Sequence, residues 1–156
     1  MRFSDLRNSC GARSRAGPGT VLRFGGAGGC LYGTAAAHPI EGAHSIWELA
    51  LHLTGTYGLV LRRLEGDGRR LAPQEDWPEA PAPGAENWND TIRRLRQLNQ
   101  DIRRRVSGFP ADRLDAPLVA EASYTAYTQF IGITQHDLYH AGQIAVLKRA
   151  LLAPAR

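Results

Sequence analysis

The stretch that decides the fold is HDLYHAGQIAVLKR, residues 136–149, near the end of a 156-residue chain. Its two histidines, His136 and His140, are four residues apart within a longer apolar segment. Four residues are a little over one helical turn, so both imidazoles project from the same helix face. Two neutral imidazoles on a buried face each need a partner, and a divalent metal ion meets that need for both. The spacing predicts a long helix that carries part of a metal site.

Two other segments show the apolar periodicity of helices. Ser45, followed three residues later by Glu48, has the capping-box pattern of a helix start. Apolar residues then recur at helical spacing, which predicts a helix over 45–65. A second apolar stripe predicts a helix over 88–107, ended by glycine and proline. The segment between them, 66–87, is rich in proline, glycine and acidic residues and is expected to be a long loop.

The segment around His136 predicts a third helix over about 123–151. Its apolar residues spread around most of the circumference, which is typical of a central helix in a bundle. Beyond a short extended piece at 117–120, no strand pattern occurs in residues 38–156. The predicted fold class is therefore all-α, an up-down helical bundle over residues 38–156.

Residues 1–37 differ in composition from the rest of the chain. They hold 8 of the 17 glycines and show neither helical nor strand periodicity. We expect an irregular or disordered leader; loose packing against the body, a targeting peptide, or a start-site or reading-frame error are the alternatives. Both cysteines, Cys10 and Cys30, lie in this leader without a metal-binding or disulfide pattern. Their absence from the body favours a reducing environment, and the expected location is the cytoplasm.

The net charge of +4 does not indicate a nucleic-acid-binding protein. Five arginines and one aspartate in the leader account for all of it, and the remaining chain is balanced. A nucleic-acid interface needs basic residues clustered on a folded surface. No apolar run approaches the roughly 20 residues of a membrane span. We therefore expect neither nucleic acid nor membrane as a partner.

His52 lies midway along the predicted helix 45–65 and is the candidate third ligand. A single histidine on a half-buried helix face is more often a hydrogen-bonded core residue, so its role depends on whether it faces His136 and His140. Gln143 shares the face of the pair, and Glu48 lies one turn before His52; either could orient a ligand or a bound water. The zincin protease motif HExxH is rejected, because aspartate follows the first histidine of the pair.

Several motifs together resemble the DinB/YfiT-like family of metal-dependent proteins. They are SIWELALHLTGTY (45–57), EDWP (75–78), a helix led by Trp88, and HDLYHAGQIAVLKR (136–149), and the resemblance covers about residues 38–151. It implies a four-helix bundle in which one histidine of the second helix and the HxxxH pair of the last helix bind a divalent metal, often zinc or nickel. By that match His52, His136 and His140 are the ligands. The family begins with an apolar helix of its own, which residues 1–37 do not resemble.

The resemblance also implies a function. Characterised relatives include thiol transferases that use bacillithiol or similar thiols and a mycothiol-dependent isomerase. Three imidazoles leave coordination positions free, as a catalytic metal requires. We expect a metal-dependent transferase that joins a low-molecular-weight thiol, supplied as a cosubstrate, to a small electrophilic substrate. The alternatives are a metal-dependent hydrolase and a non-catalytic metal-binding stress-response protein, and a homodimer formed through apolar faces is the expected assembly for the latter.

Overall fold

The computed structural model describes residues 29–152, which are helical and contain no β-strand. This confirms the all-α prediction, and the extended piece expected at 117–120 is not a strand. Five α-helices and one short 3-10 helix, η1, make up the described part of the chain. They are α1 (Gly29–Ala36), α2 (Ile46–Leu64), α3 (Pro73–Asp76), α4 (Ala85–Ser107), η1 (Ala111–Arg113) and α5 (Ala126–Leu152).

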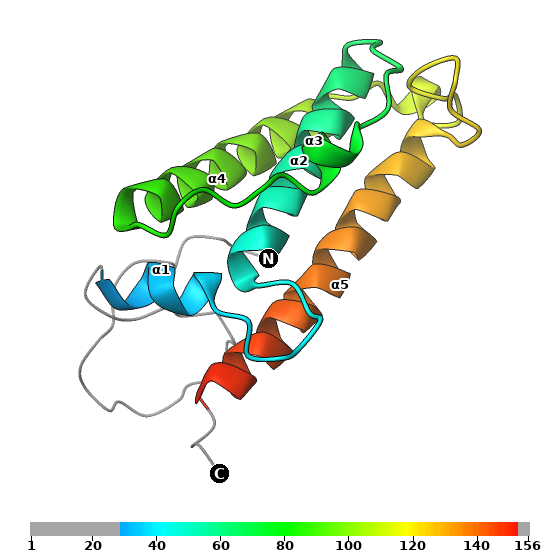
Figure 1. Ribbon diagram of the computed structural model, residues 1–156. Helices are drawn as coiled ribbons and strands as arrows, with labels where there is room; N and C mark the ends of the chain where they lie inside the picture. Colours follow the sequence, from blue (N-terminus) through cyan, green and yellow to red (C-terminus); the bar gives the residue numbers. More distant parts are fainter. Residues whose placement is uncertain (1–28, 153–156) are drawn as a thin grey trace.

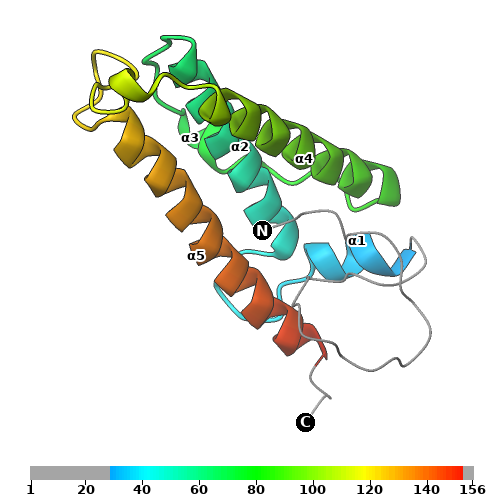
Figure 2. The same cartoon turned by 180° about the vertical axis from the view of Figure 1, so that it is seen from behind.

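Helix α2 is the centre of the arrangement. It packs against both α4 and α5, whereas α4 and α5 share few contacts with each other. Figure 1 shows α4 and α5 diverging on either side of α2, and Figure 2 shows the same order from behind. The short helix α1 lies across one end of the long helices and contacts α2 and α4. Side chains of α2 are therefore covered by α4 on one side and by α5 on the other.

The ends of α2 form as the capping pattern predicts. The Ser45 side chain accepts a hydrogen bond from the backbone N–H of Glu48, and the Glu48 carboxylate accepts one from the backbone N–H of Ser45. At the other end Gly66 has a φ of +88°, a left-handed conformation that glycine adopts without steric cost. These local signals confirm the predicted helix to within one residue at each end.

Two predicted segments differ from the structure in their details. Helix α4 begins one turn before the predicted 88–107, at Ala85, and α3 forms a single turn inside the predicted loop 66–87. Residues 1–37 were expected to be irregular, yet their end forms α1, and Ala35 is buried in the core. Alanine, glycine and threonine carry no strong periodic signal, so only packing against α2 reveals this helix. Residues 1–28 lie outside the described part of the chain.

The core is built from one face of each long helix. Trp47 is fully buried, packs edge-on against Trp88 and donates a hydrogen bond to Thr91 Oγ1 over 3.0 Å. The other buried apolar residues of this cluster are Ala35, Ile46, Leu49, Ala50, Leu53, Tyr57, Val60, Leu95, Leu98, Ile102, Ile133 and Leu147. Burial of these side chains is the main favourable contribution to folding.

Helix α5 is not the central helix that its all-round apolarity predicts. Several of its large apolar side chains are exposed: Tyr127, Ile131, Leu138, Tyr139, Val146 and Leu152. These side chains are exposed because, of the other long helices, α2 is the one that packs against α5 and it covers one side only. Hydrophobic composition alone cannot distinguish a helix that is surrounded from one that is covered on a single side. None of the helices in the described part of the chain combines the length and the apolarity that crossing a bilayer demands.

Candidate metal centre

The structure brings His52, His136 and His140 together between α2 and α5. His52 Nε2 lies 2.9 Å from His136 Nε2, and His140 Nε2 lies 3.1 Å from the same atom. His52 and His140 are buried, and His136 is partly buried. Within residues 29–152, these three side chains are a group whose ligand atoms are close enough to hold one metal ion. The sequence did not decide whether His52 faces the HxxxH pair. The structure shows that it does.

Hydrogen bonds on the far side of two rings determine which nitrogens point inward. His52 Nδ1 donates to the backbone carbonyl oxygen of Asp76 over 2.8 Å, and His140 Nδ1 donates to Gln143 Oε1 over 2.6 Å. Since a neutral imidazole carries one hydrogen, both Nε2 atoms then present lone pairs. His136 Nε2 can donate a hydrogen to only one of them. At least one of these two lone pairs therefore receives no hydrogen from His136.

A divalent cation fits this donor set. The pKa of His136 is lowered to about 4 by burial and by the neighbouring His140 and His52, and burial also lowers the pKa of His140. Lowered pKa values favour the neutral forms of His136 and His140, whose lone pairs a divalent cation can accept. In a tetrahedral site with metal–nitrogen distances of about 2.0–2.1 Å, neighbouring nitrogens lie about 3.3 Å apart. The two spacings that involve His136 Nε2, 2.9 and 3.1 Å, are within about half an ångström of that value, and all three ligand atoms lie within 4.8 Å of one another.

Helix α3 positions His52 by bringing Asp76 against α2. Its close approach depends on Gly55, where an added Cβ would lie 2.3 Å from the backbone carbonyl oxygen of Glu75. Asp76 Oδ1 also lies 3.1 Å from His52 Nδ1, so a carboxylate and a carbonyl face the same ring nitrogen. Carboxylate and carbonyl partners of this kind fix the tautomer of a ligating histidine and raise its basicity.

Trp77 covers the His52 side of the site. Its ring stacks on His52 with centroids 4.0 Å apart and on His44 with centroids 3.8 Å apart, in both cases nearly parallel. Through this stack, Trp77 anchors the segment 66–87 to the body at the three-histidine cluster. His44 is half exposed and forms the outer layer of this stack.

The two predicted orienting groups have different outcomes. Gln143 contacts His140 directly, as its spacing on the helix predicts. Glu48 does not orient His52: its carboxylate accepts from the backbone N–H of Ser45 and pairs with His38 Nε2 at 2.9 Å. The Glu48 carboxylate is engaged by the capping box at the start of α2, where it accepts a hydrogen bond from a free backbone N–H, and it is therefore held away from His52. Asp76 takes the place that the sequence assigned to Glu48.

A partly buried polar network includes Asp137, the residue that follows His136, and was not found from the sequence. Tyr57 of α2 donates a hydrogen bond to Asp137 Oδ2 over 2.7 Å, and Asn99 of α4 donates to the Tyr57 hydroxyl over 3.3 Å. Burial raises the pKa of Asp137 to about 6, although the hydrogen bond from Tyr57 acts in the opposite direction. Burial and the nearby Asp137 raise the pKa of Tyr57. The network ties α2, α4 and α5 together beside the site.

Comparison with known proteins agrees with this geometry. Residues 33–144, most of the chain, match the model of the DinB superfamily. The match includes α2 and both histidines of α5, so it covers every candidate ligand. No curated protein and no solved structure gives a significant match. The family match, the helical fold and the three-histidine cluster of this chain all point to the same family. The chain belongs to the DinB superfamily.

Proposed function

We propose that this protein is a divalent-metal-dependent enzyme that transfers a low-molecular-weight thiol to a small electrophile. The observation that carries the proposal is the convergence of three Nε2 atoms contributed by His52, His136 and His140. Three protein ligands leave at least one coordination position for an exchangeable molecule, as in catalytic zinc sites; structural sites are closed by four. Zinc and nickel both suit three imidazoles.

The residues around the site have distinct roles in this proposal. The cation supplies Lewis acidity, which lowers the pKa of a thiol or water held beside it. Asp76 and Gln143 hold the rings of His52 and His140 in the orientation that directs Nε2 inward. Trp77 limits the access of water from the side of His52. In the overall reaction the S–H bond of the thiol breaks, a C–S bond forms, and the electrophile releases its leaving group.

Metal loading followed by a conjugation assay tests the proposal. Untagged protein should contain about one equivalent of zinc or nickel by elemental analysis. Loaded protein should accelerate the reaction of L-cysteine with 1-chloro-2,4-dinitrobenzene. His52→Ala should lose the metal and lower the rate by more than about 100-fold, because loss of an outer partner alone costs about 10–100-fold. His38→Ala, at an exposed histidine outside the cluster, is the matched control and should behave like wild type.

The same assays separate the alternatives. Equal conjugation rates for wild type and His52→Ala would contradict the proposal. Metal-dependent hydrolysis of 4-nitrophenyl acetate without thiol conjugation would instead assign the protein as a hydrolase. Tight metal binding with neither reaction, and no water exchange at the metal, would assign it as a metal-binding protein without catalysis.

A further inference from the structure

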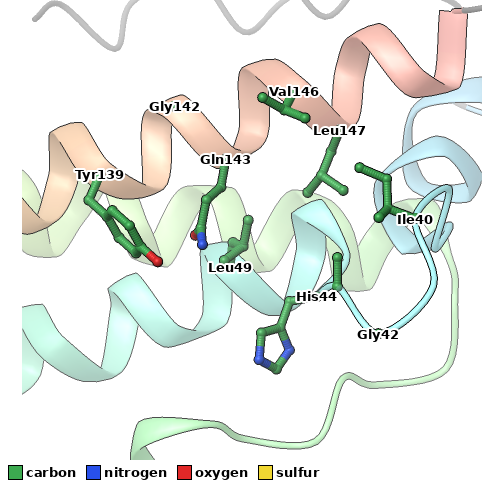
Figure 3. A pocket seen from close by; sticks show the side chains of 10 residues that line it. Ile40, Gly42, His44, Leu49, Tyr139, Gly142, Gln143, Val146 and Leu147 are labelled. Atoms are coloured by element: carbon green, nitrogen blue, oxygen red, sulfur yellow. The ribbon is translucent and has the colours of Figure 1, made fainter.

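A pocket of about 520 Å³ lies next to the metal centre, between the start of α2 and the second half of α5. This volume falls within the range of small-molecule sites, about 300–1,000 Å³. Figure 3 shows Gln143 and Leu147 directed from α5 toward α2, with Leu49 of α2 facing them. Tyr139 and Val146 also line the pocket and are exposed, so they form its mouth.

Two side chains connect the pocket to the three histidines. Gln143 lines the pocket and accepts a hydrogen bond from His140 Nδ1 over 2.6 Å. His44 also lines it and stacks on Trp77, which in turn stacks on His52. The pocket is thus one side chain away from two of the three candidate ligands. A molecule held there would have one end close to the metal centre.

The walls of the pocket define the chemistry of its occupant. No lysine, arginine, aspartate or glutamate lines it, its surface is mainly apolar, and half of its lining residues are aliphatic: Ile40, Ala43, Leu49, Val146 and Leu147. A charged group placed against these walls would lose its hydration without gaining a partner of opposite charge. The polar groups available are the amide of Gln143, the hydroxyl of Tyr139 and the half-exposed imidazole of His44, each able to donate a hydrogen bond to a neutral oxygen.

We propose that this pocket binds the apolar body of an uncharged electrophile, the substrate that receives the thiol. The inference rests on the proposed function for the identity of the reaction, but the preference of the pocket for a neutral, apolar molecule follows from its walls alone. For an aryl chloride the balanced step forms a C–S bond, breaks the C–Cl bond and releases chloride, and the thiol proton passes to solvent. The polar thiol approaches the metal from outside the pocket.

Gly142 allows a direct test by filling the pocket. It lines the pocket on α5, and an added Cβ would meet no atom within 4 Å, so a larger side chain can enter without a backbone clash. We expect wild type to bind the neutral fluorescent probe N-phenyl-1-naphthylamine. Gly142→Leu should weaken this binding by about tenfold or more, because leucine occupies the space that the probe needs. Ala145→Leu, an exposed site on the same helix outside the pocket, is the matched control and should bind like wild type.

A charge comparison provides the second measurement. Wild type should prefer 1-chloro-2,4-dinitrobenzene over 4-chloro-3,5-dinitrobenzoate by about tenfold or more, measured as competition with the probe, because no lysine or arginine lines the pocket to pair with the carboxylate. Val146→Trp is a second variant, which narrows the mouth of the pocket. It should weaken binding of the probe as Gly142→Leu does. Circular dichroism establishes that each variant is folded before it is compared.

The outcome of these measurements can be distinguished from the outcome of the tests of the proposed function. His52→Ala should lose metal and conjugation yet keep probe binding, because the pocket does not require the metal. Probe binding by wild type that is insensitive to both Gly142→Leu and Val146→Trp would overturn the pocket assignment, even with full conjugation activity. Failure of wild type to bind the probe would also overturn it, and would indicate that the pocket is filled by protein. Equal affinity for the two chlorides would overturn the neutral-substrate assignment.

Discussion

At the residue scale, the position of one hydrogen on each imidazole decides what the site can do. Asp76 and Gln143 accept hydrogen bonds from Nδ1 of His52 and His140, and this leaves Nε2 of both rings as a lone-pair donor. His136 Nδ1 is buried and has no hydrogen-bond partner within residues 29–152. Residues outside the cluster orient the rings of His52 and His140, whereas the His136 ring is held through its Nε2, which lies within hydrogen-bond distance of the other two histidines.

The pH dependence of stability in the metal-free protein follows from two adjacent groups with opposite effects. The pKa of His136 is lowered from 6.5 to about 4, so its contribution to stability is complete above pH 6.5 and is lost as the pH falls toward 4. The pKa of Asp137 is raised from 3.8 to about 6, so stability is gained as the pH falls from 6 toward 3.8. In wild type these two effects on the free energy of unfolding therefore oppose each other between about pH 4 and pH 6.

Replacing Asp137 separates these two contributions. Metal-free Asp137→Asn should lose more stability between pH 6.5 and 4 than wild type does, because the compensating carboxyl is absent. Urea midpoints measured across this range in the presence of a chelator provide the test. Asp90→Asn, at an exposed carboxylate on α4, is the control for removing one negative charge. An identical pH profile for wild type and Asp137→Asn would contradict the assignment.

At the scale of elements, the short helix α3 acts as a support for α2. Its backbone passes so close to Gly55 that no side chain fits between them, and this contact brings Asp76 to His52. Glycine in a helix interior costs about 1 kcal/mol relative to alanine. In α2 this cost is offset by a hydrogen bond that orients a candidate ligand.

Gly55→Ala should therefore weaken metal binding without removing a ligand. The added methyl group must displace the backbone at Glu75, which moves Asp76 away from His52. We expect a loss of about 1–3 kcal/mol of stability and an about 10–100-fold weaker zinc affinity by isothermal titration. Gly58→Ala is the matched control, because a Cβ there meets no atom within 4 Å and should stabilise α2 by about 1 kcal/mol. Unchanged zinc affinity in Gly55→Ala would show that α3 does not position His52.

At the scale of the whole molecule, a metal would join two helices that share a modest interface. The candidate ligands come from α2 and α5, which lie 84 residues apart in sequence between His52 and His136. α5 exposes large apolar side chains and packs against α2 as its long-helix neighbour. A cation bound to both helices therefore stabilises the folded chain over the unfolded one.

Metal loading should raise the melting temperature measurably. Zinc at 100 times its Kd adds about 2.7 kcal/mol, which corresponds to a shift of about 5–10 °C for a chain of this size. Differential scanning calorimetry of wild type with zinc and with a chelator measures the shift. His52→Ala, which lacks the ligand from α2, should show little of it. A shift of equal size in that variant would mean that zinc stabilises the protein elsewhere.

Local signals predicted much of the fold. The capping box at Ser45, the left-handed glycine at Gly66 and the apolar stripe of α4 depend on neighbours within one or two helical turns, so they are legible in the sequence. The HxxxH spacing of His136 and His140 is local in the same way. Helix α1 was missed because its residues carry no periodic pattern, and α5 was expected at the centre because its composition does not record which neighbours it has.

The sequence by itself determined the all-α class, the extents of the long helices to within one turn, and a pair of candidate metal ligands on α5. Only the tertiary structure decided that His52 faces this pair, that Asp76 rather than Glu48 orients it, and that an uncharged pocket adjoins the site. The physical reason is sequence separation. Helix formation depends on residues three and four apart, whereas each of these contacts joins elements that meet only when α2, α3 and α5 pack together.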